Sequence, residues 1–320
     1  MFGGYGEVLE RDLGDGRLIR RRAVPVRRVT ALALSPDERT LIVAGGDPGV
    51  RGLLVALEID ANEDRIRAGD DVARIAASTE LFFDAAWSAD GKRLAAVGGD
   101  RSLRVWNVTR DAERVTFEPT LRIDAHADWA TTVRWRPDGS QLLTAGRDVT
   151  ARLFDANDGK LMANFTGHDN APSAAIFARD PDSIFSADGR GERKIQEWLA
   201  KTGQKITSKK PDDKTKDDQK TNPREYRVNP FGKGLTDVTT LLLVDDNPLV
   251  ATKNTLVWLR DDTRATIRTF AAGEGTLLAA GSHAETKRLV AVDDRGEIFV
   301  WKSDAKEPIE RFQALPGKKR

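Results

Sequence analysis

The sequence predicts an all-β fold built from a repeated unit of roughly 45 residues. The segment Leu142–Asp155 reads as an apolar strand, a tight turn with Asp148, and an alternating strand ending in an aromatic residue and an acid. Leu94–Asn107 has the same form. Equivalent strand-end positions follow one another at steps of 46, 49, 48, 44, 60 and 43 residues. They are Arg11, Leu57, Trp106, Phe154, Trp198, Trp258 and Trp301. A nearly constant period with one enlarged step indicates a repeat architecture.

Composition narrows the class of protein. With 39% hydrophobic and 32% charged residues, the chain of 320 residues is expected to be soluble and to bury a core. No apolar run approaches the roughly 18 residues that span a bilayer, and the N-terminus lacks the features of a secretory signal. The sequence does not determine the cellular compartment, and the cytoplasm is the default expectation. The net charge of +1 argues against a dedicated nucleic-acid binder. The absence of cysteine excludes disulfides, thiolate metal sites, a cysteine nucleophile and covalent haem attachment in this chain.

Turn signals at intervals of 8 to 12 residues place the strands in order. Residues 6–22 read as strand, turn, strand, and match a later segment beginning at Gly296. The first full repeat is expected from about Val24 to Arg67, with a Ser-Pro-Asp corner after its first strand. Later repeats are expected to begin near Leu81, His126, His168, Leu235 and Gly275.

The enlarged step between Trp198 and Trp258 contains an insertion at about residues 204–233. Its core, KKPDDKTKDDQK, has no aromatic or aliphatic residue and cannot bury enough surface to order itself. A solvated, disordered loop is the simpler interpretation of this charged segment, and a partner-binding segment is the alternative.

The third repeat resembles the WD40-repeat family. The resemblance rests on its turns and polar positions, namely His126, Val133, Trp135, Pro137-Asp138-Gly139, Thr144, Asp148 and Phe154-Asp155. It covers nearly the whole chain in the degenerate form found in bacterial-type repeats. It implies a single β-propeller domain over residues 1–320, in which four-stranded blades pack around a channel.

The family resemblance also implies a buried polar relay in each blade. It assigns this structural role to His126, Thr144 and Asp148 in the third repeat, where Phe154 replaces the tryptophan that ends the relay. The second repeat keeps Asp100 and Trp106 but has a serine at the histidine position, and the fourth keeps His168, Ser186 and Trp198. Buried polar groups are normally hydrogen-bonded, so we expect these residues to be structural rather than catalytic.

The number of blades follows less directly from the pattern. There are seven third-strand positions but six complete repeats. Residues 6–22 either add a hairpin to six blades or belong to an incomplete seventh blade. We expect the seven-blade plan, with six full repeats and a partial N-terminal blade.

The predicted function is a non-catalytic protein–protein interaction scaffold that binds partners through its loop face. Trp129 and Arg147 lie in such loops of the third repeat, and Arg28 holds the position equivalent to Trp129 in the first. Large aromatic residues are favoured binding hot spots, although Trp129 could equally pack at the blade rim. The partner is expected to be a protein of unknown identity, with no nucleic acid, no membrane span and no small-molecule ligand.

Two other classes of function are compatible with the sequence. One is an accessory propeller domain or fragment of a larger multidomain bacterial protein, with any haem module outside this chain. The other is a propeller hydrolase, which is disfavoured because no G-x-S-x-G, H-E-x-x-H or paired-histidine metal spacing occurs. No catalytic residue, metal site or cofactor is therefore expected.

The N-terminal arginines form a cluster that can be interpreted in two ways. It could attract an acidic partner or a phosphate. Charge that protects an edge strand from aggregation is the plainer explanation, since alternating residues point to opposite faces. The cluster consists of Arg17, Arg20, Arg21, Arg22, Arg27 and Arg28.

Overall fold

The computed structural model describes residues 2–59, 71–111, 114–180, 182–188, 195–201, 235, 237–260, 266–283, 286–305 and 307–313. The insertion expected at about 204–233 lies outside the described residues. The chain divides into two compact units, residues 1–162 and 163–320. Every regular element in the described ranges is a strand, so the all-β prediction is confirmed.

The sheets that begin in the first unit are antiparallel, and the last strand of the third, β14, runs across the boundary at residue 162. Their strand orders are β1-β2-β3-β4-β5-β6, β10-β9-β8-β7 and β11-β12-β13-β14. Chain neighbours pair within each sheet, as expected for blades that are formed in series. The strands are β1 (Phe2–Gly3), β2 (Tyr5–Arg11), β3 (Leu18–Leu34), β4 (Thr40–Asp47), β5 (Arg51–Glu58), β6 (Asp71–Ser78), β7 (Phe82–Trp87), β8 (Arg93–Gly98), β9 (Ser102–Arg110), β10 (Val115–Asp124), β11 (Ala130–Trp135), β12 (Gln141–Gly146), β13 (Ala151–Asp155) and β14 (Leu161–Phe165).

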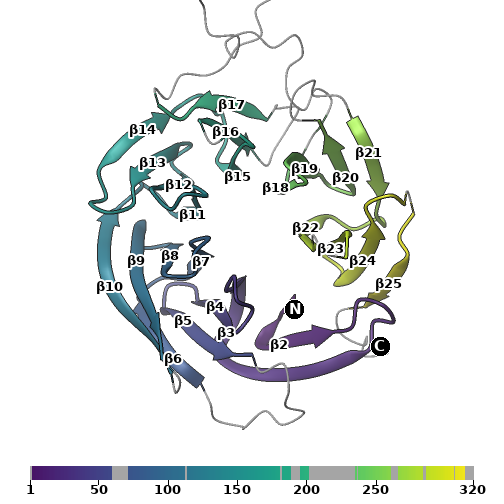
Figure 1. Cartoon of the computed structure of the whole chain (residues 1–320), viewed down its shortest axis with the longest axis horizontal. Coiled ribbons are helices and arrows are strands. Elements are labelled where there is room, and N and C mark those ends of the chain that lie inside the picture. Colours follow the sequence, from purple (N-terminus) through teal and green to yellow (C-terminus); the bar gives the residue numbers. More distant parts are fainter. Residues whose placement is uncertain are drawn as a thin grey trace, which may run out of the picture. The chain divides into compact units, whose positions relative to one another are not determined.

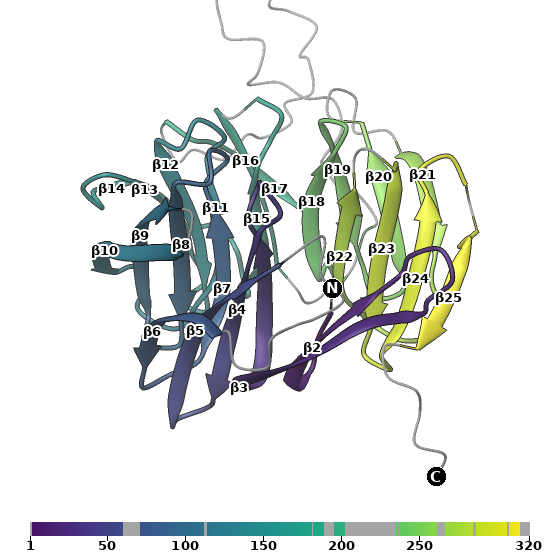
Figure 2. The same ribbon diagram turned by 60° about the horizontal axis from the view of Figure 1, so that its bottom comes forward.

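The second unit contains sheets of order β15-β16-β17, β18-β19-β20-β21 and β22-β23-β24-β25. Figure 2 shows the four strands of the last of these sheets side by side. The strands are β15 (Pro172–Phe177), β16 (Ser183–Asp188), β17 (Gln196–Leu199), β18 (Thr240–Val244), β19 (Asn247–Ala251), β20 (Thr255–Leu259), β21 (Thr266–Ala271), β22 (Leu277–His283), β23 (Arg288–Asp293), β24 (Glu297–Lys302) and β25 (Glu310–Gln313).

Both faces of the blade-type sheets are buried, which explains their nearly continuous apolar strands. In the first unit, Ile42 and Leu54 of the first sheet pack in one cluster with Phe82 and Trp106 of the second. The opposite face of the second sheet packs on the third in another cluster. In the second unit, the face of the fifth sheet that carries Trp258 packs on the sixth. Face-to-face packing of successive four-stranded sheets is the arrangement of propeller blades.

The N-terminal hairpin belongs to the first sheet. Figure 1 shows β3 as one long strand that leaves the hairpin with β2 and continues beside β4. Residues 24–27 of β3 have no register partner on β2, and Pro25, which has no N–H to donate, lies in this stretch. The chain can therefore bend there without breaking a ladder hydrogen bond.

The partial seventh blade is not confirmed. The described residues form six sheets, and the hairpin is continuous with the first of them. Its apolar residues Val8, Val24 and Val26 instead cover the face of that sheet on which Val43 and Val55 lie. The hairpin thus covers a face that a preceding blade would cover, although it is not a separate sheet.

No helix in the described part of the chain is long and apolar enough to cross a membrane.

Candidate functional site: a loop surface and the polar relays beneath it

The third sheet carries a buried relay centred on His126. His126, whose side chain is fully buried, lies in the loop before β11. Its Nδ1 atom is 2.9 Å from Oδ1 of Asp148, and its Nε2 atom is 2.8 Å from Oγ1 of Thr144. A Cβ atom at Gly146 would come within 2.5 Å of Nδ1, so only glycine leaves room for the ring. The structure therefore brings together the three residues that the resemblance assigned to one relay.

The protonation of this relay follows from its surroundings. Burial lowers the pKa of His126, and the hydrogen bond to Asp148 offsets only part of that effect. Burial raises the pKa of Asp148, but hydrogen bonds from the backbone of Ala127, from Thr150 and from His126 outweigh it and leave that pKa below its usual value. A carboxylate can only accept hydrogen bonds, so Nδ1 of the neutral ring donates to Asp148 and the Thr144 hydroxyl donates to Nε2.

The second sheet has a shorter version of the same network. The Ser78 hydroxyl donates to Oδ2 of Asp100 at 3.0 Å, so the serine at the histidine position still meets the acid. Ala96 occupies the position of Thr144, because Ala96 pairs with Arg104 as Thr144 pairs with Arg152. No hydroxyl is present there to link Trp106 to the network. Trp106 instead lies in the apolar cluster between the first two sheets.

An arginine completes both networks, and sequence reasoning missed it. Arg152 donates from Nη2 to Asp148 at 3.1 Å, from Nε to Thr150 at 3.2 Å and from Nη1 to the carbonyl of Ala125 at 2.8 Å. Arg104 makes the equivalent three bonds, to Asp100, Ser102 and the carbonyl of Ala77. The signal was present in the sequence as Asp-x-[Ser/Thr]-x-Arg in DRSLR and DVTAR.

The fourth sheet contains a relay that includes its tryptophan. Nε1 of Trp198 donates to Oγ of Ser186 at 2.7 Å, and Nε2 of His168 lies 2.7 Å from the same oxygen. On its other side the His168 ring meets the side-chain amide of Gln196. Nε2 of Gln196 lies 3.3 Å from Nδ1 of His168 and donates to the carbonyl of Gly167 at 2.8 Å.

Trp129 and Arg147 form an exposed pair on the two segments that the His126 relay joins. Trp129 is 37% exposed, and the Arg147 guanidinium lies over its ring at 4.5 Å from the centroid. Phe83 of the second sheet lies 5.2 Å from the same ring, and Nε of Arg147 is 3.9 Å from the Asp128 carboxylate. The two loops are joined, because the Arg147 amide donates to the Trp129 carbonyl at 2.8 Å.

The structure places Arg28 elsewhere, on β3 of the first sheet, where it is exposed and pairs with Tyr5 and Gly46. Its neighbour Arg27 lies over the Tyr5 ring at 5.3 Å and 3.7 Å from the Asp47 carboxylate. Tyr5 is 68% exposed. The first sheet thus has its own aromatic and cationic pair, which the sequence analysis did not single out.

The titratable residues near this surface are engaged in structural contacts. The described residues contain no group of three or more histidine, cysteine or carboxylate residues that could hold a metal ion. The two buried histidines are hydrogen-bonded within relays, and Asp148 has an arginine partner. The most prominent arrangement is therefore an exposed aromatic and cationic surface on loops whose positions are set by buried hydrogen bonds.

The fold and this site together define a β-propeller-type repeat protein. A family model for the WD domain, G-beta repeat (WD40) matches residues 76–107 and 117–155. These two segments, which include most of the second and third repeats, are thus similar to WD40 repeats, as the resemblance of the third repeat implied.

Curated relatives match part of the chain. Protein HIR1 of Cryptococcus neoformans is 27% identical over 160 residues, which cover 49% of this chain and 17% of the relative. The transcriptional corepressor LEUNIG_HOMOLOG of Arabidopsis thaliana is 34% identical over 100 residues, covering 31% and 12%. The chain therefore spans only a small part of the relatives it matches. They give no support for the bacterial-type detail of the resemblance.

A solved structure agrees with the fold. The computationally designed Ika8 protein matches with a TM-score of 0.65 over 97% of this chain and 85% of its own, at 15% sequence identity. At that identity the likeness concerns the fold alone.

Proposed function

We propose that this chain is a non-catalytic protein–protein interaction module whose partner contacts the surface formed by Trp129 and Arg147. The observation that carries the proposal is the stacking of the Arg147 guanidinium on a partly exposed tryptophan. Tryptophan and arginine are the residue types most enriched at binding hot spots. Asp148 and His126 hold both loops in place from below, so little ordering entropy is lost when a partner binds.

The first sheet supports a wider contact surface. Arg28 and Tyr5 pair across β2 and β3, and Tyr5 and Val50 are 68% and 70% exposed. We therefore include Arg28 in the proposed surface, with Tyr5 and Arg27 beside it. The relatives' printed names include a transcriptional corepressor and a nuclear distribution protein, which agrees with roles exerted through other proteins. We further propose that the chain itself does not bind nucleic acid, because its net charge is only +1 and a dedicated nucleic-acid binder would be strongly basic.

A second proposal concerns the size of the protein. The relatives are much longer than the segments they share with this chain, which favours a propeller that serves as one domain of a larger protein.

We also propose that the two units belong to one propeller domain, since the likeness to the designed protein covers 97% of the chain. In a seven-blade plan the N-terminal hairpin would contribute the partial blade. An in-frame coding sequence for two further strands upstream of Met1 would support that plan, and an in-frame stop would contradict it.

The interaction surface can be tested by affinity capture with a double variant. We expect Trp129→Ala with Arg147→Ala to lose a partner that the unchanged chain retains, because truncating a hot-spot residue costs about 2 kcal/mol or more of binding free energy. The matched control is Leu161→Ala with Met162→Ala on β14, where the side chains are 47% and 48% exposed. If the unchanged chain and the double variant recover every captured protein equally, this surface is not the binding site.

A further inference from the structure

The aromatic surface around Trp129 extends onto the second sheet. The Phe83 ring has its centroid 5.2 Å from that of Trp129. It also borders the turn between β8 and β9, because a Cβ atom at Gly99 would lie 3.5 Å from it. The two rings therefore join the loop ends of the second and third sheets.

Glu80 continues this surface onto the first sheet. A Cβ atom at Gly99 would lie 3.1 Å from that of Glu80, whose Oε2 atom accepts a hydrogen bond of 3.2 Å from the Gly49 amide. Val50, the next residue in that turn of the first sheet, is 70% exposed. We call the whole the extended surface. It consists of Val50, Glu80, Phe83, Trp129 and Arg147.

Phe83 departs from the usual chemistry of its position. It is the bulge residue of β7, which has no register partner on β8. The bulge residues of three other sheets are Thr30, Thr131 and Ser173, whose hydroxyl groups donate to strand carbonyls at 3.1, 3.2 and 3.1 Å. Phenylalanine cannot make that hydrogen bond and instead places a ring beside Trp129. Bulges are known to redirect side chains towards functional sites.

Exposed arginines border the extended surface. Arg101 lies two residues after Gly99 in the turn between β8 and β9, and Arg51 directly follows Val50. Arg28 lies on β3, beside the same turn of the first sheet. None of these three arginines forms an ion pair with a carboxylate in the described part of the chain.

The carboxylates of the same loops already have partners. Asp128 lies 3.9 Å from Arg147, and Asp47 lies 3.7 Å from Arg27. Glu80 accepts its hydrogen bond from the backbone. The charge that these loops offer to a partner is therefore mainly positive.

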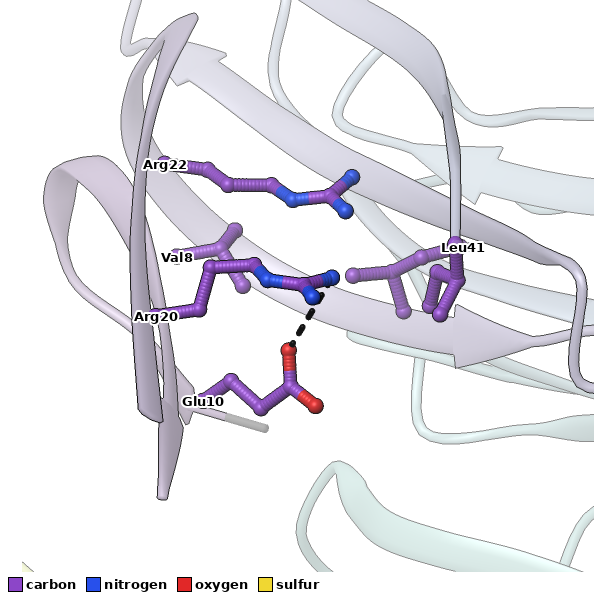
Figure 3. Close-up of a pocket in the computed structure, with 6 residues that line it drawn as sticks. Val8, Glu10, Arg20, Arg22 and Leu41 are labelled. Carbon is purple, nitrogen blue, oxygen red and sulfur yellow. Dashed lines mark ion pairs between the residues drawn. The ribbon is translucent and has the colours of Figure 1, made fainter. Parts of the chain in front are cut away.

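The arginines of the N-terminal hairpin lie elsewhere. Figure 3 shows Arg20 and Arg22 extending towards Leu41, and Arg20 lies 3.8 Å from Glu10. Leu41 lies near the start of β4, whereas Arg28 pairs with the other end of that strand. The N-terminal arginine cluster is thus divided, and only its last members border the extended surface.

We propose that the partner of the extended surface is a protein segment in which acidic residues flank an apolar side chain. This inference rests on the function proposed above and adds the chemistry of the partner. The apolar side chain packs on the rings of Phe83 and Trp129, where aromatic contacts contribute beyond buried area alone. The acidic residues lie against Arg101 and Arg147, since a guanidinium can donate two parallel N–H bonds to a carboxylate.

A single-stranded nucleic acid also combines negative charge with flat groups that stack on aromatic rings. The carboxylates of Glu80 and Asp128 lie among these loops, however, and they would repel a strand that carries a phosphate at every nucleotide. A peptide can place apolar residues opposite them. The charges therefore favour an acidic peptide.

Fluorescence anisotropy with labelled probes tests the proposal on the full chain. The probes are an acidic heptapeptide of sequence DELEFED, its neutral counterpart NQLQFQN and a thymidine octanucleotide. We expect the acidic peptide to bind saturably and roughly tenfold more tightly than the neutral one, through several exposed ion pairs. This preference should shrink as salt is added, because salt screens exposed charges.

Variants assign the two parts of the interaction. Arg101→Gln with Arg147→Gln should remove most of the preference for the acidic peptide. The matched control is Arg39→Gln with Arg114→Gln, two exposed arginines at the opposite end of the sheets, and it should retain the preference. Phe83→Thr should weaken both peptides by a similar factor, roughly fivefold, because a ring contact is lost. Threonine occupies this position in the third sheet, so the variant is expected to fold, which thermal denaturation checks.

The proposal is overturned if the acidic peptide does not bind, if the neutral peptide or the octanucleotide binds as tightly, or if both arginine pairs have the same effect. The affinity capture described above tests the surface itself. A captured partner that depends on Trp129 and Arg147, without binding of the acidic peptide, would reject only the chemistry inferred for the partner. Equal capture by the double variant would reject the surface as well.

Discussion

The Nη2 atom of Arg152 lies 3.1 Å from Oδ2 of Asp148, and this ion pair closes the turn that carries Arg147. Asp148 is also bonded to His126 and to the amide of Ala127, so one carboxylate joins the loop before β11 to the turn between β12 and β13. The exposed Trp129–Arg147 pair lies on these two segments. The buried network therefore determines the geometry of the exposed surface.

Replacing Arg152 with methionine should destabilise the fold by about 2–3 kcal/mol, because Asp148 and the Ala125 carbonyl both lose a donor in a largely buried site. Urea denaturation followed by circular dichroism measures the change. The control is Arg147→Met in the same turn, whose side chain is 51% exposed and should stay within about 0.5 kcal/mol of the unchanged chain. Similar losses for both variants would contradict a special role for the Arg152 ion pair.

Replacing Trp198 with phenylalanine should cost about 1 kcal/mol or somewhat more, because the hydrogen bond from Nε1 to Ser186 is lost along with part of the ring's packing. Trp106→Phe is the matched comparison, since Trp106 is equally buried and Ala96 leaves it no hydroxyl partner in its own sheet. Chemical denaturation of both variants should show the larger loss for Trp198. The opposite order would show that packing, not the relay, determines the cost.

Much of the fold could be predicted from the sequence, because the strand pattern is local. The strands ending near Trp198, Trp258 and Trp301 lie where the repeat period placed them, as β17, β20 and β24. The sheet to which residues 6–22 belong could not be predicted in the same way. Alternation identifies a hairpin, but nothing local says whether it forms its own sheet or continues through Pro25 into the next.

The candidate surface was predictable only in part, for a related reason. Trp129 and Arg147 come together because both loops border one sheet, a relationship that the repeat pattern already contains. Phe83 reaches the Trp129 ring from a different sheet, and no spacing within one repeat reports such a contact. The contact of Val8 with Val43 and Val55 depends on how the hairpin folds back over its own sheet, which follows from tertiary packing.

The stability of the fold should depend on pH through His126. Burial holds the pKa of His126 below its unfolded value of about 6.5, so between these two values the unfolded chain binds more protons. The contribution of neutral His126 is therefore complete above about pH 6.5 and is lost as the pH falls towards the folded pKa. The stability difference between the unchanged chain and His126→Gln should shrink between about pH 7.5 and pH 5.5. A difference that stays constant over this range, measured by urea denaturation at each pH, would contradict this account.

Val149 should be replaceable with a gain in stability. It follows Asp148 with φ of 66°, a left-handed conformation that is unfavourable for a β-branched residue. The equivalent residue after Asp100 is Arg101, which has φ of 67°, so the conformation belongs to the turn itself and not to the side chain. Asparagine tolerates this region, and Val149→Asn should raise the free energy of unfolding by about 0.5–1 kcal/mol. Val133→Asn on β11 is the control, because Val133 is fully buried in a strand and the same exchange there should be strongly destabilising. A loss of stability in Val149→Asn would show that the packing of the half-buried valine outweighs the strain of its backbone.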